Sequence, residues 1–200
     1  MKLVFATNNP NKLSEIRDLV PTGIEILSLK DINCKEELPE TNPSLEGNAL
    51  QKAKYVFDNY GFNCFADDTG LEIEALNGEP GVYSARYAGQ DCSAEDNMNK
   101  VLEKLALEEN REAKFRTVIA LIVDGKETLF EGECKGRMTK IKSGVDGFGY
   151  DPIFKPKGYD ITFAEMTKNE KGAISHRGKV VDKLVGFCTA NQSTNTNLKH

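Results

Sequence analysis

The chain has 200 residues, a formal net charge of −5, and hydrophobic and charged shares of 39% and 28%, which are ordinary for a globular protein. No run of about 18 apolar residues is present, so we expect no helix that spans a membrane. The negative charge argues against a nucleic-acid backbone as the main partner, but it allows a small anionic ligand in a local basic pocket.

Met1 and Lys2 lead directly into LVFAT, which is too short for the apolar core of a signal peptide. We therefore expect the chain to remain in the cytoplasm.

The five cysteines are scattered and no pair has Cys-x-x-Cys spacing, a pattern that favours reduced and mostly buried thiols. Because the chain has only two histidines, a zinc site is not expected.

The N-terminal residues predict a strand, a helix and a second strand. Residues 2–7 (KLVFAT) form an apolar run of strand length. In the NNPNK segment that follows, Asn9 suits a helix N-cap and Pro10 the first helical position, where a missing N–H costs nothing. Apolar residues then keep helical spacing up to Val20, and IEIL (24–27) indicates the second strand.

The next segment predicts a loop, a helix and a buried strand. An acidic loop, CKEELPETNP (34–43), precedes Ser44, which can cap a helix that runs to Asn59 or Tyr60 and is closed by Gly61. NCFA (63–66) then indicates a buried strand that ends at two adjacent aspartates.

The second half of the chain continues the alternation. Ser93 is predicted to cap a third helix, and a last helix is predicted to start near Ser175. KFRTVIALIV and ETLFEGEC are predicted to be strands joined at Asp124-Gly125 or by a slightly longer turn, the strongest hairpin signal in the chain. Helices interleaved with strands, of which this pair is antiparallel, predict an α/β protein with a mixed sheet. Residues 191–200 are expected to form a loose polar tail.

The first candidate for chemistry is ATNNPNK (6–12), where a strand end feeds a helix N-terminus. Backbone N–H groups there, with the side chains of Thr7, Asn9 and Lys12, would form a phosphate cradle. The segment lacks the glycines of a Walker loop, and a capped helix with a surface lysine is the alternative.

The second candidate is the pair Asp67 and Asp68 at the end of the buried strand. Adjacent side chains on a strand point to opposite faces, so one carboxylate can face a ligand while the other supports the structure. Mg²⁺ is usually held by one or two carboxylates plus substrate phosphates. The segment KEELPE (35–40) offers further carboxylates. The alternative is that the pair caps a turn before Gly70.

Two later segments complete the candidate set. In GFGYDP (147–152), glycines let the backbone approach a flat ligand and Phe148 can stack on a base, although a structural turn with a core phenylalanine is the alternative. In EKGAISHRGK (170–179), positive charge and donors gather beside a helix start, which a solvated basic helix end also explains. Together the segments predict a nucleoside triphosphate site.

In the same order along the chain, these segments resemble those of the inosine/xanthosine triphosphate pyrophosphatases, enzymes that remove deaminated purine nucleotides. The resemblance runs from about residue 2 to residue 188. The motifs that carry it are ATNNPNK, PETNPSLEGNALQKA, ADDTGL, GEPGVYSARYAG, GFGYDPIF and EKGAISHRGK.

The resemblance implies a two-lobed α/β domain over residues 1–190, with a mixed twisted sheet, flanking helices and a central substrate cleft. It also implies Mg²⁺-dependent hydrolysis of a purine nucleoside triphosphate to the monophosphate and pyrophosphate, and a homodimer. Carried over by position, Asp68 would be the catalytic base, and Glu40 and Asp68 would bind Mg²⁺. The substrate-binding residues would be Thr7, Asn8, Asn9, Pro10, Asn11, Lys12, Lys52, Thr69, Arg86, Phe148, Gly149, Tyr150, Asp151, Lys171, His176 and Arg177.

The chain departs from the family pattern at four positions. Asn8 and Asn42 stand where glycine is frequent, Gly47 where a second glutamate is frequent, and Thr69 where serine is common. The threonine keeps the hydroxyl, whereas Gly47 removes a possible carboxylate from that helix.

Base choice follows from the C6 substituent of the purine. His176, Arg177 and nearby backbone N–H groups would donate to the C6 oxygen of ITP or XTP. They would leave the C6 amino group of ATP without an acceptor, at about 1–3 kcal/mol for each buried mismatch. We therefore expect ITP, dITP and XTP to be preferred over ATP, with GTP intermediate or poor. The alternatives are hydrolysis of other modified nucleotides, such as pyrimidine triphosphates, and a non-catalytic nucleotide-binding module.

Overall fold

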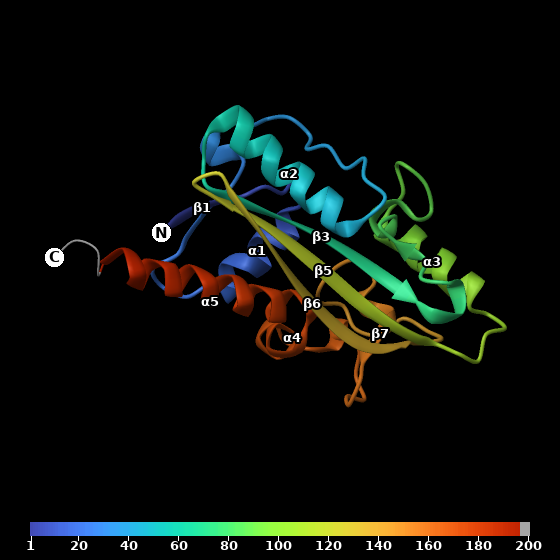
Figure 1. Cartoon of the computed structure of the whole chain (residues 1–200). Helices are drawn as coiled ribbons and strands as arrows, with labels where there is room; N and C mark the ends of the chain where they lie inside the picture. Colours follow the sequence, from blue (N-terminus) through green and yellow to red (C-terminus); the bar gives the residue numbers. More distant parts are fainter. Residues whose placement is uncertain (197–200) are drawn as a thin grey trace. The chain divides into compact units, whose positions relative to one another are not determined.

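A computed structural model describes residues 1–196 of the chain, with side chains described through residue 191. In chain order the helices and strands are β1 (Lys2–Phe5), α1 (Pro10–Leu19), β2 (Glu25–Leu27), α2 (Leu45–Tyr60), β3 (Cys64–Ile73), β4 (Pro80–Gly81), α3 (Ala94–Lys104), β5 (Glu112–Val123), β6 (Lys126–Met138), β7 (Phe154–Pro156), α4 (Lys168–Ile174) and α5 (His176–Thr196) (Figure 1). Helix α5 thus continues into the expected tail at 191–200, whose last four residues lie outside the described part.

Seven strands form a mixed sheet in the order β2-β1-β3-β5-β6-β7, with β4 paired to β3. β1 is parallel to β2 and β3, whereas β4 and β7 pair antiparallel with β3 and β6. The predicted hairpin joins β5 to β6: Asp124 and Gly125 have φ of 51° and 79°, as a two-residue turn of this kind requires. The predicted α/β fold with a mixed sheet and flanking helices is confirmed.

The chain divides into two compact units. Unit 1 comprises Met1–Asp68, Val118–Glu131 and the chain from Arg177 onward, and unit 2 comprises Thr69–Thr117 and Gly132–His176. The divisions fall inside β3, β5 and β6 and after the first residue of α5.

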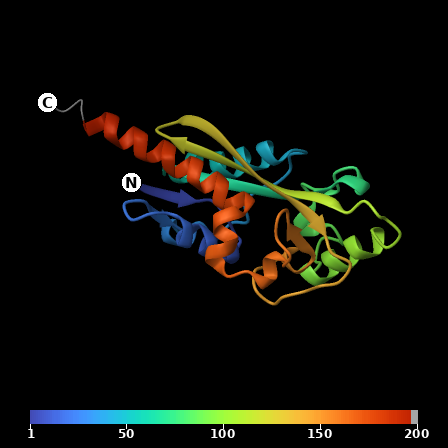
Figure 2. The same ribbon diagram turned by 90° about the horizontal axis from the view of Figure 1, so that it is seen from below.

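In unit 1, helices lie on both faces of the strands (Figures 1 and 2). Ile16 of α1 and Val181 of α5 share one buried cluster with Phe5 and Phe65, whose rings stack with centroids 4.6 Å apart. On the other face, the Cys64 thiol contacts a backbone carbonyl oxygen of α2 at 3.2 Å. In the part of β3 that belongs to unit 1 (residues 64–68), alternation therefore directs odd-numbered residues toward α1 and α5, and even-numbered residues toward α2.

The predicted helix ends are confirmed by their capping interactions. Asn9 caps α1, and Ser44 caps α2 by accepting a hydrogen bond from a backbone N–H at 3.0 Å. Gly61, with φ of 70°, ends α2 in the left-handed conformation. Ser93 and Asp96 form a reciprocal capping box at the start of α3.

Strand β3 is longer than predicted, and the expectation that the aspartate pair ends a strand is wrong. Asp67 and Asp68 both lie inside the ten-residue β3. Gly70 is not a turn residue either: a Cβ at that position would lie 2.8 Å from the carbonyl oxygen of Gly81, so glycine permits the close pairing of β4. The pair is therefore held within the sheet.

A short helix, α4, precedes the predicted last helix and was not expected from the sequence. Thr167 and Glu170 form a capping box at its start. Because α4 has only seven residues, its apolar spacing is too brief to indicate a helix by periodicity.

Unit 2 has its own core, in which Met98 and Val101 of α3 join Leu71 and Ile73 of β3. Through residue 196, no helix is long and apolar enough to cross a membrane. All five cysteines lie in the described part of the chain and are free thiols, and four of them are buried, as predicted.

Candidate functional site

Asp67 lies at the centre of a buried ion-pair cluster in unit 1. Its side chain is 1% exposed, Lys12 Nζ donates to one carboxylate oxygen at 3.0 Å, and Arg177 Nη2 lies 3.5 Å from the other. Arg177 also pairs with Glu15. Burial alone would raise the pKa of Asp67, but Lys12, Arg177 and Lys52 outweigh it and hold that pKa below the ordinary range. Asp67 is thus an ionised partner for two cations that the sequence analysis assigned to the substrate.

Asp68 points toward α2 and has a different environment. The residue is 7% exposed, and Asn48 Nδ2 donates to its Oδ2 at 3.1 Å. Burial raises the pKa of Asp68, and the charge of Glu40 adds to that, although Lys52 and Lys12 oppose the shift. A carboxylate with a raised pKa is a better proton acceptor near neutral pH, so this environment suits a general base.

Lys52 of α2 and Glu40 of the acidic loop form an ion pair. Lys52 is 4% exposed. Burial disfavours its charged form, but the carboxylates of Asp67, Glu40 and Asp68 outweigh burial and raise its pKa. For Lys12, burial prevails over the attraction of Asp67, and its pKa is lowered. The cluster therefore combines cations suited to phosphate with carboxylates suited to a metal ion.

Glu40 and Asp68 are the candidate metal ligands. Their charges interact, as the effect of Glu40 on the Asp68 pKa shows. Within residues 1–196, no group of three or more His, Cys, Asp or Glu side chains is arranged to hold a metal ion. Two carboxylates are the usual protein share for Mg²⁺, which takes its other ligands from phosphates and water. The donor set fits Mg²⁺ that binds together with a triphosphate.

The predicted phosphate cradle uses several of its own N–H groups internally. The Asn9 carboxamide oxygen accepts from the backbone N–H of Asn11 at 2.9 Å and of Lys12 at 3.3 Å. Thr7 Oγ1 accepts from the Asn9 N–H at 3.1 Å, and the Asn8 side chain bonds to the acidic loop. What this segment offers to a phosphate is therefore mainly the Lys12 ammonium, and less the backbone N–H groups at the start of α1.

In unit 2, Asp151 organises the segment that was predicted to hold the base. Its buried carboxylate accepts from the Phe148 N–H at 2.9 Å and from Lys171 Nζ at 2.7 Å, and Lys171 Nζ lies 4.9 Å from the centroid of the Phe148 ring. The Tyr150 hydroxyl donates to a backbone carbonyl oxygen at 2.7 Å. Gly149 adopts a φ of 62°, which favours glycine. The structure thus brings together the predicted aromatic platform and its lysine.

Three further predicted residues of unit 2 have separate contacts. The His176 ring is 3% exposed and stacks on Phe115, with centroids 4.7 Å apart and planes 19° apart. The Thr69 hydroxyl hydrogen-bonds to a threonine hydroxyl of β5 at 2.8 Å. The guanidinium carbon of Arg86 lies 5.2 Å from the centroid of a tyrosine ring. His176 therefore belongs to the aromatic core of unit 2, while the next residue, Arg177, belongs to the ion pairs of unit 1.

Two departures from the family pattern are complementary in the structure. A Cβ at Gly47 would lie 2.7 Å from the side chain of Asn42, too close for any residue other than glycine while the asparagine keeps its position. The asparagine at position 42 therefore favours glycine at position 47, so the two departures are linked.

Two further polar residues of the cluster were not predicted from the sequence. Asn48 is 1% exposed and contacts Asp68, and Glu15 pairs with Arg177. A signal for Asn48 was present, because it precedes Lys52 by four residues and shares its helix face. A polar side chain on an otherwise apolar face indicates a buried partner.

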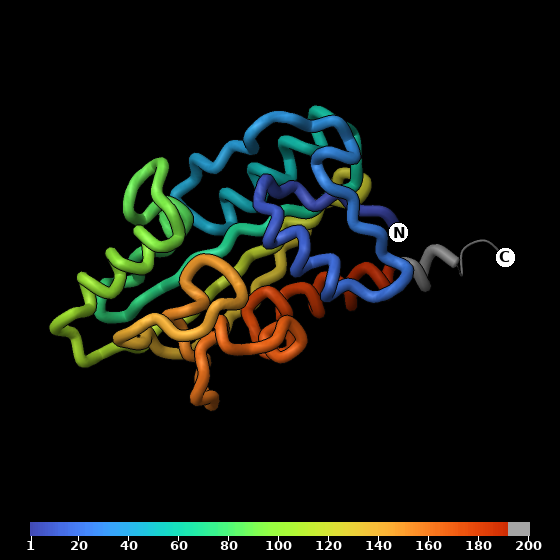
Figure 3. The backbone as a smooth tube through the Cα atoms, turned by 180° about the vertical axis from the view of Figure 1, so that it is seen from behind, coloured from blue at the N-terminus to red at the C-terminus, as the bar shows by residue number. Residues whose placement is uncertain are grey.

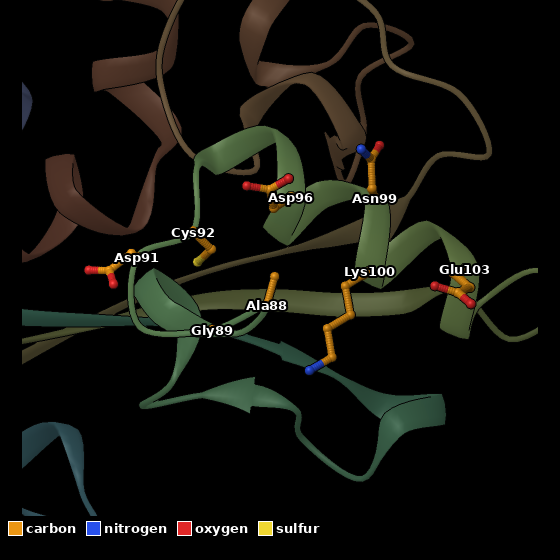
Figure 4. Close-up of a pocket in the computed structure, with 8 residues that line it drawn as sticks. All are labelled: Ala88, Gly89, Asp91, Cys92, Asp96, Asn99, Lys100 and Glu103. Atoms are coloured by element: carbon orange, nitrogen blue, oxygen red, sulfur yellow. The ribbon is translucent and has the colours of Figure 1, made fainter.

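A surface pocket of about 680 Å³ also lies in unit 2, beside α3 (Figure 4). Asp96 is used in the capping box of α3, and Lys100 Nζ donates to the backbone carbonyl oxygen of Tyr87 at 2.6 Å. None of the residues that line this pocket was predicted to belong to the nucleotide site. They are Ala88, Gly89, Asp91, Cys92, Asp96, Asn99, Lys100 and Glu103.

Comparison with known proteins places this geometry in a family. The model of the Ham1 family matches residues 3–187. A dITP/XTP pyrophosphatase of Flavobacterium johnsoniae is 57% identical over 190 residues, covering 95% of this chain and 99% of the relative. One from Flavobacterium psychrophilum is 55% identical, covering 94% and 98%. The solved structure of a HAM1 protein from Coxiella burnetii matches with a TM-score of 0.87 at 35% identity, covering 95% of this chain and 99% of that one. The chain belongs to the Ham1 family, which confirms the resemblance found in its sequence.

Proposed function

We propose that the chain is a nucleoside triphosphate pyrophosphatase that hydrolyses deaminated purine nucleotides (ITP, dITP and XTP) to the monophosphate and pyrophosphate. The observation that carries this proposal is the geometry around Asp68: its buried carboxylate accepts a hydrogen bond from Asn48 of α2, the helix whose Lys52 pairs with Glu40, and Lys12 pairs with the adjacent Asp67. The names of the relatives, dITP/XTP pyrophosphatases at up to 57% identity, support the same reaction.

In this proposal, water attacks the α-phosphorus and the bond to the oxygen that bridges the α- and β-phosphates breaks, which releases pyrophosphate. Asp68 accepts the proton of the attacking water. Lys12 and Lys52 bind phosphate oxygens and offset the charge of the leaving pyrophosphate. Mg²⁺, held by Glu40 and Asp68 together with the phosphates, would supply Lewis-acid neutralisation of charge at the reacting phosphate.

The ion pairs of unit 1 give a reason for selectivity toward triphosphates. Lys12 is paired with Asp67, and Lys52 with Glu40. Phosphate oxygens must compete with these carboxylates, so a ligand with one phosphate gains little from the exchange. A triphosphate can engage both lysines, and Mg²⁺ bound with it would offset the charge of Glu40 once Lys52 turns to phosphate.

Lys12→Ala and Lys52→Ala are each expected to raise KM for ITP about 10-fold or more, because each removes a charge-assisted hydrogen bond worth about 1.5–3 kcal/mol. The affinity for IMP should change less. Lys54→Ala is the matched control, since Lys54 also lies on α2 but is 48% exposed and pairs with Glu127. Calorimetric titration with IMP and steady-state kinetics with ITP measure the two effects. Equal losses for the two nucleotides would contradict the phosphate role.

The direct test of the function is hydrolysis of a nucleotide panel with Mg²⁺, in which the products are identified as monophosphate and pyrophosphate. The kcat/KM for ITP, dITP and XTP should exceed that for ATP a hundredfold or more. The reason is that bound ATP would leave about two buried polar groups unpaired, at about 1–3 kcal/mol each. GTP should be intermediate or poor. An enzyme equally active on ATP would refute the base selection. A preference for pyrimidine triphosphates would change the substrate class, and a protein that binds but never hydrolyses would be a nucleotide-binding module.

Two variants separate base reading from base stacking. His176→Ala should lower the ratio of ITP to ATP turnover, because the proposal assigns the C6 contact to this residue. Phe148→Ala should weaken all purine substrates about equally, because stacking does not depend on the exocyclic group. Melting temperatures of both variants must be compared, since the His176 ring also packs on Phe115. An unchanged ITP/ATP ratio in a folded His176→Ala protein would remove His176 from base reading.

The proposal extends to the setting of the enzyme. We assign it to the cytoplasm, where nucleoside triphosphates are made and consumed, and to a homodimer, with a purine nucleotide and no nucleic acid as its ligand. Light scattering after size exclusion should give the mass of two chains, and a mass of one chain would contradict the dimer.

A further inference from the structure

The acidic loop that carries Glu40 has no regular secondary structure between η1 (Lys30–Ile32) and α2, and Figure 3 shows its irregular course. A metal ligand on such a segment must be held in position by other contacts, because a loop without backbone pairing is more mobile than a helix or strand. The loop obtains this support from amide side chains.

Asn8 holds the loop on the N-terminal side of Glu40. Its carboxamide oxygen accepts from the Leu38 N–H at 3.0 Å, and its Nδ2 donates to the Glu36 carbonyl oxygen at 3.2 Å. Both hydrogen-bonding ends of the carboxamide are therefore used on the loop. The bonded amide of Leu38 stands two residues before Glu40.

Asn48 holds the loop on the C-terminal side. Its carboxamide oxygen accepts from the Asn42 N–H at 2.8 Å, two residues after Glu40. Its Nδ2 donates to Asp68 Oδ2 at 3.1 Å. One buried side chain thus bonds both to the loop that bears Glu40 and to the second candidate metal ligand.

We infer that Asn8 and Asn48 are positioning residues that bracket Glu40, and that Asn48 fixes the loop and the Asp68 carboxylate relative to one another for metal and water. This inference rests on the proposed function of Glu40 and Asp68. Neither asparagine side chain is required to touch the substrate. Asn8, which the sequence analysis counted with the phosphate ligands, acts through the loop instead.

The two positions have separable effects. Asn8→Ala releases only the loop, so it should raise the Mg²⁺ concentration for half-maximal rate, and saturating Mg²⁺ should restore kcat. Asn48→Ala releases both the loop and Asp68, so kcat should stay low at saturating Mg²⁺. Removing a side chain that orients a metal ligand through a hydrogen bond typically lowers metal affinity or activity about 10–100-fold. Asn59→Ala is the matched control. Asn59 also lies on α2, and its exposed side chain donates a hydrogen bond to the Tyr55 carbonyl oxygen of the same helix at 2.8 Å.

The decisive readout uses the protein without nucleotide. Amide hydrogen exchange followed by NMR should be faster at Leu38 in Asn8→Ala and at Asn42 in Asn48→Ala, while Asn59→Ala leaves both rates unchanged. Mn²⁺ binding, followed by water-proton relaxation, should weaken in the first two variants alone. Should Asn48→Ala fail to fold, the exposed Asn8 side chain still provides the test.

Unchanged exchange at these amides, or an unchanged Mg²⁺ requirement in an active enzyme, overturns the inference. Faster exchange with a raised Mg²⁺ requirement supports it. A wild-type protein that hydrolyses no nucleotide overturns the proposed function instead, and the exchange rates still decide whether the asparagines hold the loop.

Discussion

Asp68→Asn is expected to lower kcat for ITP at least about 100-fold, because it removes the proposed general base and a candidate metal ligand in one step. The substitution keeps the shape of the side chain, and its carbonyl oxygen can still accept the bond from Asn48. Folding should therefore be retained. Steady-state kinetics at saturating Mg²⁺, with circular dichroism and a melting temperature, measure the two properties together.

The control for this experiment is Asp31→Asn, which removes a carboxylate that is 48% exposed and bonds to Ser28. It should leave kcat unchanged. A near wild-type kcat for Asp68→Asn under saturating Mg²⁺ would show that another group activates the water.

Asp67→Ala is expected to cost about 3–5 kcal/mol of unfolding free energy, because it removes one partner of a buried ion-pair cluster and leaves Glu15 as the remaining ion-pair partner of Arg177. Here Lys12 and Arg177, which are 14% and 2% exposed, both lose a carboxylate. Chemical denaturation measures the loss. Asp67→Asn should reproduce most of it, since it keeps volume and removes charge.

The comparison that isolates the buried charge is Glu25→Ala. Glu25 pairs with Lys2 on the surface, where the side chains are 54% and 70% exposed, and its removal should change stability little. Equal, small losses for Asp67→Ala and Glu25→Ala would show that the cluster around Asp67 does not stabilise the fold.

The lowered pKa of Asp67 also predicts how the free energy of unfolding depends on pH. Its folded-state pKa lies below the ordinary value of 3.8, so its contribution to stability is present above that value and is lost as the pH falls through the lowered pKa. In Asp67→Asn this part of the acid sensitivity should be absent. Denaturation midpoints measured from neutral to acidic pH test the difference.

Most of the local structure could be predicted because its causes are local. Asn9, Ser44 and Ser93 cap helices with their own side chains, and Gly61 and Asp124-Gly125 adopt backbone conformations that few other residues tolerate. Such features involve neighbours a few residues apart, so the amino-acid order is sufficient to indicate them.

The end of β3 could not be predicted in this way. The strand continues through two aspartates and Gly70 because strands from later in the chain pair with it: β5 is its neighbour in the sheet, and β4 pairs with its end at Leu71↔Gly81. Nothing within the local sequence indicates that pairing, and adjacent carboxylates followed by glycine ordinarily favour a turn.

For the candidate site, the sequence by itself determined the family and the residue types: two lysines, paired aspartates, an acidic loop and an aromatic segment. Only the tertiary structure decided the partners. Lys12 and Asp67 are 55 residues apart in the chain, and Asp67 and Arg177 are 110 apart. Packing then gives the adjacent aspartates opposite pKa shifts. Desolvation raises the pKa of both, but the cations on one face of β3 outweigh it and lower the pKa of Asp67, whereas on the other face desolvation prevails and the pKa of Asp68 is raised. Charge and solvent access at a side chain depend on which elements pack around it, and this is a property of the fold rather than of neighbouring residues.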